Sequence, residues 1–91
     1  MPEYKAWWII RDGGFSSQEA LQDVFKLTKI DDYETKPSFL MFETKFTNKK
    51  KAREHNERLT KMLWDFEWYR KADCSVCGVQ TKEDGKWIDE V

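Results

Sequence analysis

The sequence predicts an α+β fold in a single domain that spans residues 1–91. Segments with strand-like and helix-like patterns follow one another in the order strand, helix, weak strand, strong strand, helix, strand. A length of 91 residues suits one domain. Five Trp, six Phe and three Tyr supply enough apolar area to fill a small core without disulfide bonds, so a packed fold is expected.

The first strand and the first helix have clear patterns. Residues 5–11 (KAWWIIR) are apolar without interruption between their basic ends, which is typical of a strand buried on both faces. Residues 12–14 (DGG) end that strand. Ser16 is placed to cap a helix over residues 17–27 by accepting a hydrogen bond from the amide of Glu19. The apolar side chains of this helix recur on one stripe, so we expect the stripe to face a sheet.

The next two segments predict a weak strand and a strong strand. Acidic residues crowd residues 29–35, which makes this segment an edge strand at best. Pro37 marks a boundary, and residues 38–46 (SFLMFETKF) have the composition of a strand. In that strand Leu40, Phe42 and Phe46 point one way, whereas Phe39, Met41, Glu43 and Lys45 point the other way.

A long helix is predicted over residues 49–70, with Thr47 or Asn48 as its cap. Its core-like positions recur at steps of three and four, which is the period of a helix with one buried face. These positions are Ala52, His55, Leu59, Met62, Phe66 and Tyr69.

The last part of the chain predicts a hairpin. Asp84-Gly85 is the strongest turn signal in the sequence, and it would place Glu83 opposite Lys86. The complete βαββαβ order is that of a ferredoxin-like (split βαβ) sandwich, here with an added C-terminal β-hairpin strand. Right-handed crossovers place both helices on one face of the sheet and leave the other face available for a partner.

Charge and hydropathy limit the location and the partners. Sixteen basic and seventeen acidic residues nearly cancel, so no overall field favours nucleic acid or an anionic membrane. No apolar run approaches the roughly 20 residues of a membrane span. The first five residues, MPEYK, lack the features of a signal peptide. We therefore expect a cytoplasmic protein without a membrane partner.

Cys74 and Cys77, the only cysteines, have the spacing of a zinc knuckle, in which a short turn aims two thiolates at one ion. Structural zinc needs four ligands, and His55 is the sole histidine that can supply a third. Two copies of the chain could also share one ion. The alternative is a pair of small thiols that pack as apolar side chains, in which case the chain needs no cofactor. Thiol–disulfide chemistry is less expected, because no helix start follows Cys74.

A basic cluster near the start of the long helix predicts nucleic-acid binding as an alternative function. Its members are Lys45, Lys49, Lys50, Lys51 and Arg53. In a fold like that of RRM domains, Trp7 on the first strand and Phe39 and Met41 on the third would lie near the positions whose side chains stack on bases. The signature motifs of those domains are absent, and the cluster is equally consistent with a solvated helix end.

Trp64 and Trp68 are one helical turn apart and lie off the core-like positions of the long helix. Either the C-terminal hairpin covers them through Trp87, or they anchor a protein partner or a second copy of the chain. Aromatic anchors of this kind are typical of protein interfaces.

No nucleophile with a base, no carboxylate pair in a pocket and no metal triad is legible in the sequence. The sequence thus predicts a small non-enzymatic binding or regulatory module that engages a protein partner, or its own second copy, through an aromatic helix face. The alternatives are an RNA- or DNA-binding domain and a module stabilised by a zinc knuckle.

Overall fold

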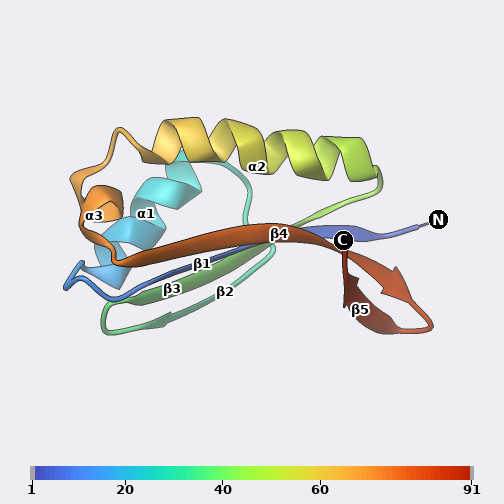
Figure 1. Ribbon diagram of the computed structural model, residues 1–91, viewed down its shortest axis with the longest axis horizontal. Coiled ribbons are helices and arrows are strands. Elements are labelled where there is room, and N and C mark those ends of the chain that lie inside the picture. Colours follow the sequence, from blue (N-terminus) through green and yellow to red (C-terminus); the bar gives the residue numbers. More distant parts are fainter. Residues whose placement is uncertain (1, 91) are drawn as a thin grey trace.

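The computed structural model describes residues 2–90 of the chain. Its elements are β1 (Tyr4–Arg11), α1 (Ser17–Leu27), β2 (Asp32–Lys36), β3 (Phe39–Phe46), α2 (Lys49–Leu63), α3 (Glu67–Lys71), β4 (Cys74–Glu83) and β5 (Lys86–Asp89). The strands form an antiparallel sheet in the order β2-β3-β1-β4-β5. The helices lie on one face of this sheet, and the other face carries no helix of the described residues (Figure 1).

The predicted α+β architecture is confirmed, because the described residues contain a five-stranded antiparallel sheet and three helices. The order departs from a simple βαββαβ pattern, since the short helix α3 precedes β4 and a fifth strand, β5, follows it. The expectation that the helices share one face of the sheet is also confirmed (Figure 1). Within residues 2–90, no helix has the length and apolar character needed to cross a membrane.

The core lies between the sheet and the helices. Trp8 is 2% exposed, and its ring stacks on that of Phe42 with the centroids 6.1 Å apart. The other large side chains that are fully buried here are Ile10, Val24, Leu40, Leu59 and Leu63. These residues come from β1, β3, α1 and α2, so the core ties both long helices to the two strands at the middle of the sheet.

The central strand β1 has two unlike faces. Its side chains that point to the helices, among them Trp8 and Ile10, are buried. Trp7 and Ile9 point to the open face and are only half-buried. The prediction that this strand is buried on both faces is therefore correct for one face only. The open side is covered by neighbouring side chains of the sheet rather than by a second layer.

Local signals fixed the start of each long helix and the hairpin. The Ser16 hydroxyl accepts a hydrogen bond from the amide of Glu19, as predicted for α1. The side chain of Asn48 caps α2 in the same way. The turn between β4 and β5 has Asp84 and Gly85 at positive φ, as a tight hairpin turn requires, and Glu83 pairs with Lys86 as predicted.

The helix predicted over residues 49–70 is broken in its second half, so that prediction was wrong there. The helix α2 ends at Leu63, and Phe66 adopts an extended backbone before α3 begins. The break turns the chain so that Trp68 reaches the core, where its ring stacks on Phe15 with the centroids 5.9 Å apart. Burial of this large side chain outweighs the continuation of the helix.

Candidate interaction surface

The open face of the sheet carries five apolar side chains in adjacent positions. Ile9 lies at their centre, opposite Met41 on β3 and Val76 on β4. Phe39 and Trp7 lie on either side of this central row along the strands. We call Trp7, Ile9, Phe39, Met41 and Val76 the open-face strip. Val76 is 45% exposed and the other four are half-buried, so a partner can reach the strip.

Trp7 is the largest side chain of the open-face strip. Its indole packs over Gly78 on β4, where an added Cβ would lie 2.8 Å from the ring. A glycine at this position therefore allows the close approach of the ring to the strand. The indole N–H is buried without a hydrogen-bond partner among residues 2–90. Because buried polar groups are nearly always hydrogen-bonded, this N–H is an exception, which the open face shares with His55 Nε2 of the helix layer.

Charges of opposite sign flank the open-face strip. At one end, Phe39 of β3 lies between its strand neighbours Lys36 of β2 and Arg11 of β1. The Lys36 ammonium lies 5.6 Å from the centroid of the Phe39 ring. At the other end, Glu43 and Asp32 face each other across β3 and β2. The open-face strip thus has a basic end and an acidic end.

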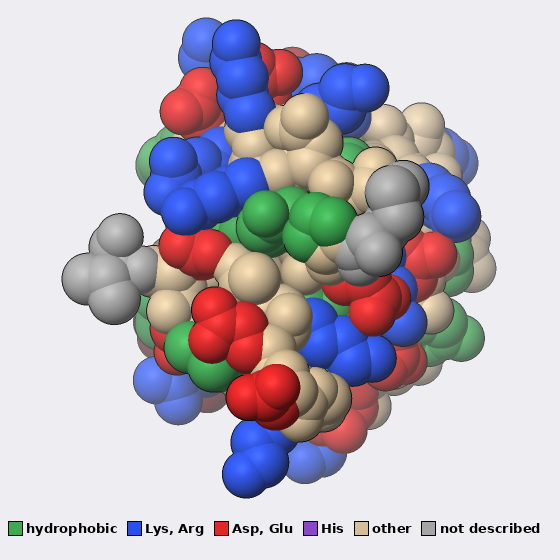
Figure 2. All heavy atoms as spheres, turned by 90° about the vertical axis from the view of Figure 1, so that its right-hand side faces the viewer, with side chains coloured by type: hydrophobic (Ala, Val, Ile, Leu, Met, Phe, Trp, Pro, Cys, Tyr) green, Lys and Arg blue, Asp and Glu red, His purple; other side chains and the backbone are tan. Residues whose placement is uncertain are grey.

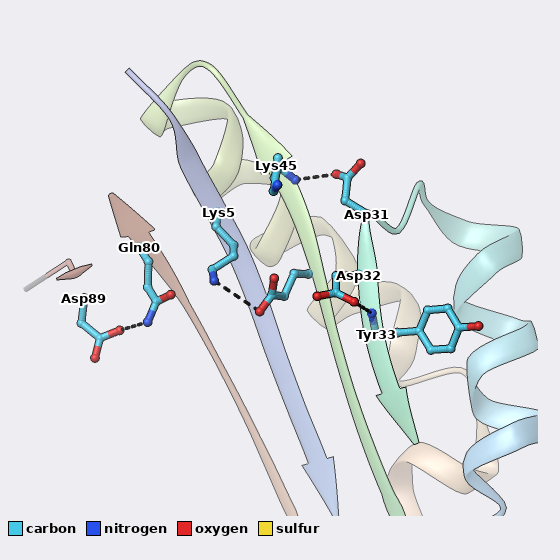
Figure 3. A network of polar contacts seen from close by, with 8 residues as sticks. Lys5, Asp31, Asp32, Tyr33, Lys45, Gln80 and Asp89 are labelled. Atoms are coloured by element: carbon cyan, nitrogen blue, oxygen red, sulfur yellow. Dashed lines mark hydrogen bonds and ion pairs between the residues drawn. The ribbon is translucent and has the colours of Figure 1, made fainter. Parts of the chain in front are cut away.

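A polar network lies beyond the acidic end, on the same side of the sheet (Figure 3). Lys5 Nζ lies 3.3 Å from Glu43 Oε1 and 4.5 Å from the centroid of the Trp87 ring. The Gln80 amide donates a hydrogen bond of 2.8 Å to Asp89 Oδ1. The ion pair to Lys5 neutralises part of the charge of Glu43, whereas Asp32 stays exposed at the edge of the sheet.

The residues predicted to bind nucleic acid fall on two sides of the sheet. Trp7, Phe39, Met41 and Lys45 lie on the open face, as their register requires. The other members, Lys49, Lys50, Lys51 and Arg53, belong to α2 in the helix layer. At that end of the molecule basic side chains gather in the upper part of the view, with acidic ones among them (Figure 2).

Two lysines of this basic cluster already have acidic neighbours. Lys49 Nζ lies 2.7 Å from Glu90 Oε2, and this contact holds the pKa of the Glu90 carboxyl below its usual range. Lys50 Nζ lies 4.0 Å from Glu54 Oε1. The aromatic and the basic halves of the predicted nucleic-acid surface are therefore separate, and the basic half is partly neutralised.

The three tryptophans predicted to bind a protein lie in three different environments. Trp64 is 56% exposed at the end of α2. Trp68 is only 7% exposed, and its indole N–H donates a hydrogen bond of 2.8 Å to Asp23. Trp87 lies on the open face, beside Lys5. The expectation that Trp64 and Trp68 share one exposed helix face is corrected, because the helix breaks between them.

The two cysteines cannot hold one metal ion in this structure. Cys74 pairs with Arg11 and lies on the open face, whereas Cys77 pairs with Trp8 and lies on the helix-covered face. The turn expected for a zinc knuckle is instead part of the extended strand β4, because its pairing with β1 fixes this segment. Burial raises the pKa of the Cys77 thiol, which disfavours the thiolate.

His55, the third predicted ligand, lies in the helix layer away from both cysteines. It is 5% exposed and packs against Phe46, with the ring centroids 5.1 Å apart. Its Nε2 is buried without a hydrogen-bond partner from the described residues. Burial, with a smaller contribution from Arg58, lowers the pKa of His55 to about 4. Within residues 2–90, no three His, Cys, Asp or Glu side chains are grouped closely enough to hold a metal ion.

The sequence analysis missed several residues of the open face. Val76, Arg11 and Lys36 were not singled out, and neither was Asp32 as a partner of Glu43. The signal was present in the alternation of the strands, since every second residue of β1, β3 and β4 points to the same face. Which strands are neighbours, and so which residues meet, came only from the register.

Comparisons with family models, with curated proteins and with solved structures each found no match to this chain. No function can be carried over from a relative on this basis. The chemistry of the open face and of the helix layer is what supports a functional proposal.

Proposed function

We propose that this chain is a non-enzymatic binding module whose open sheet face contacts a protein partner. The observation that carries the proposal is the pattern of β1. Strands of an antiparallel sheet with one solvated face alternate apolar and polar residues, but β1 is apolar from Ala6 to Ile10. The second apolar side of β1, with Met41 and Val76 beside it, is the side that the helices leave uncovered.

The composition of this face supports a protein rather than a small molecule. Aromatic and aliphatic side chains lie at its centre, and charges of both signs surround them. An apolar centre with a polar rim is the usual anatomy of a protein interface. The pocket on this face, which Trp7, Ile9, Met41 and Glu43 help to line, is a shallow depression. A deep cleft would be expected for a small-molecule site.

For the fold, we infer a ferredoxin-like (split βαβ) arrangement. The strand order β2-β3-β1-β4 supports it, because β3 separates β1 from β2 and β1 separates β3 from β4. The helices that connect these pairs lie on the same face of the sheet (Figure 1). In this proposal α3 and β5 are additions to the basic unit.

Nucleic-acid binding by the open face is the second candidate. Trp7, Phe39 and Met41 supply side chains that can stack on bases, and Lys45 lies on the same face. Against it, Asp32, Glu34 and Glu43 point to this face as well, and they would repel phosphates. The mixture of charges therefore favours a protein.

Photocrosslinking tests the proposed function. Two variants of the chain are made, each with one p-benzoylphenylalanine. The first carries it at position 41 on the open face, and the second, the matched control, carries it at position 25 in place of the exposed Phe25 of α1 in the helix layer. Each protein is irradiated in a lysate of the source organism. We expect a protein adduct from position 41 only. A nucleic-acid adduct from position 41 would favour the second candidate, and equal labelling from both positions, or none, would contradict the proposal.

A further inference from the structure

We infer that the protein that covers the open sheet face is a second copy of this chain. The inference rests on the proposed function and names the partner. Its basis is that the face is complementary to itself, which becomes visible when its residues are grouped into rows across the strands.

The central row of the open face contains Met41, Ile9 and Val76, with Glu34 at the β2 edge. Two rows flank it, each displaced by two residues along every strand. One contains Lys36, Phe39, Arg11 and Cys74, and the other contains Asp32, Glu43, Trp7 and Gly78. The first row is basic and the second is acidic.

Two copies can pack with their open faces together, related by a two-fold axis that runs parallel to the central row midway between the two faces. This axis places each flanking row of one copy over the opposite flanking row of the other copy. Lys36 of one copy then lies over Asp32 of the other, and Arg11 lies over Trp7 next to Glu43. The contacts formed are an ion pair and a cation–π contact, and symmetry makes each of them twice. The Arg11 guanidinium carries its charge at any ordinary pH.

The apolar residues of the central row meet their own counterparts in this arrangement. Met41, Ile9 and Val76 would form a continuous apolar layer between the two sheets, as in a β-sandwich. Glu34 would approach Glu34 of the second copy, which is unfavourable. Its charge is offset because Glu34 Oε2 lies 3.5 Å from Lys36 Nζ.

Charge favours this occupant, and the area of the face limits how tightly it binds. A partner of one sign, such as nucleic acid, would be attracted at one end of the open-face strip and repelled at the other. A second copy places a charge of opposite sign over each end of the open-face strip. The strands β2, β3, β1 and β4 have 5, 8, 8 and 10 residues and together cover about 500 Å² in projection. This area is less than the roughly 800 Å² per partner of a standard interface. We therefore expect a reversible dimer that dissociates in the micromolar range.

Sedimentation velocity of the purified chain across the micromolar range tests the inference, with a matched pair of variants. Ile9→Asp places a charge at the centre of the open face, and Ile88→Asp places one at an exposed position on the other side of the sheet. We expect the wild-type chain and Ile88→Asp to dimerise and Ile9→Asp to stay monomeric. A dimer that Ile9→Asp leaves intact would use another surface and would overturn the inference.

Charge exchange gives a second test that does not disturb the core, because Lys36 and Asp32 are both exposed on the edge strand β2. Lys36→Glu alone and Asp32→Lys alone each create two like-charge contacts in a symmetric dimer, so each should weaken dimerisation about tenfold or more. An equal mixture of the two variants restores both ion pairs and should dimerise about as tightly as the wild type. Failure of the mixture to recover would overturn the two-fold arrangement.

The outcomes also separate this inference from the proposed function. A wild-type chain that is monomeric throughout, yet gives an adduct with a different protein from position 41, contradicts self-association and leaves the proposed function standing. A monomer that gives no protein adduct contradicts both. An adduct of twice the chain mass from position 41 supports both.

Discussion

The two faces of the sheet show how neighbouring residues of one strand can differ in role. Trp8 and Trp7 are adjacent in β1. The indole N–H of Trp8 donates a hydrogen bond of 2.9 Å to Asn56 Oδ1, and the ring is enclosed by Phe42 and Tyr69. The indole N–H of Trp7 has no hydrogen-bond partner in the part of the chain that the structure describes. Around Trp8 the helix-covered face is thus complete in packing and in hydrogen bonds, whereas around Trp7 the open face has no covering layer and no partner for the indole N–H among residues 2–90.

The comparison teaches that apolar character alone does not distinguish a core from an interface. Both tryptophans are equally apolar in the sequence. Asn56 of α2 makes the difference, because it accepts from Trp8 and donates a hydrogen bond of 2.9 Å to the carbonyl of Gly78. No helix of the described residues supplies an equivalent group to Trp7 (Figure 1).

The largest expected effect is that of Trp8→Ala. It removes a fully buried ring and leaves a cavity, so we expect it to lower the free energy of unfolding by about 3 to 5 kcal/mol. Trp7→Ala, the matched control, removes a half-buried ring at the surface and should cost about 1 to 2 kcal/mol. Urea denaturation of the two variants measures both values. Equal losses would mean that the two faces do not differ as described.

Asn56→Leu should have the next largest effect. It leaves the indole N–H of Trp8 and the carbonyl of Gly78 without partners inside the protein, at a cost of about 2 to 4 kcal/mol. Asn48→Ala is the control, since it removes only the cap of α2 and should cost about 1 kcal/mol. If urea denaturation shows Asn56→Leu to be no worse than Asn48→Ala, the bridge from α2 to the sheet contributes little.

His55 makes the stability of the helix-covered side depend on pH. Its pKa is about 4 in the folded chain and near 6.5 when the residue is exposed. As the pH falls below 6.5, the unfolded chain takes up a proton that the folded chain does not. The free energy of unfolding should therefore fall by about 2 kcal/mol between pH 7 and pH 5. Denaturation at the two pH values measures this difference.

The control for this pH dependence is His55→Leu, which should show little change over the same interval. Asp31 and Glu90 also have lowered pKa values, Asp31 chiefly because it accepts a hydrogen bond from the Lys45 amide. Their contributions are lost at lower pH, when unfolded carboxylates become protonated. A wild-type chain equally stable at both pH values would show that His55 is not buried in its neutral form.

The smallest effect is expected for Gly78→Ala. The new methyl group would meet the far edge of the Trp7 indole at 2.8 Å, so the ring must shift. Because Trp7 faces the open side, the ring can move outward, and we expect a cost of about 1 kcal/mol or less. Tryptophan fluorescence and urea denaturation of the variant report the shift and the cost. A loss as large as that of Trp8→Ala would show that Trp7 is fixed as firmly as the core.

The sequence was informative where the signal is local. The caps Ser16 and Asn48, the Asp84-Gly85 turn and the alternation of β3 follow from interactions within a few residues, and all were confirmed. The break before Phe66 could not be predicted, because no glycine or proline marks it and its cause is the burial of Trp68 in a distant core.

The candidate site was predicted in part for the same physical reason. That one face of the sheet stays free of helices follows from the order of the elements, and Trp7, Phe39 and Met41 were placed there correctly. The turn expected around Cys74 and Cys77 is absent because the CxxC spacing has the same form in a turn and in a strand. Only the pairing of Cys74 and Cys77 with β1 decides between them.

The central place of β1 has a consequence for biosynthesis. Among the described strands β1 is made before the others, but one of its two neighbours, β4, is made only after both long helices and two further strands. Until β4 has been synthesised, the nascent chain exposes an unpaired edge of its most apolar strand, which is a template for aggregation. The sheet must therefore close late, through contacts between distant parts of the chain, and such closure is slow. We therefore expect chaperones that shield β1 during translation to raise the yield of folded protein.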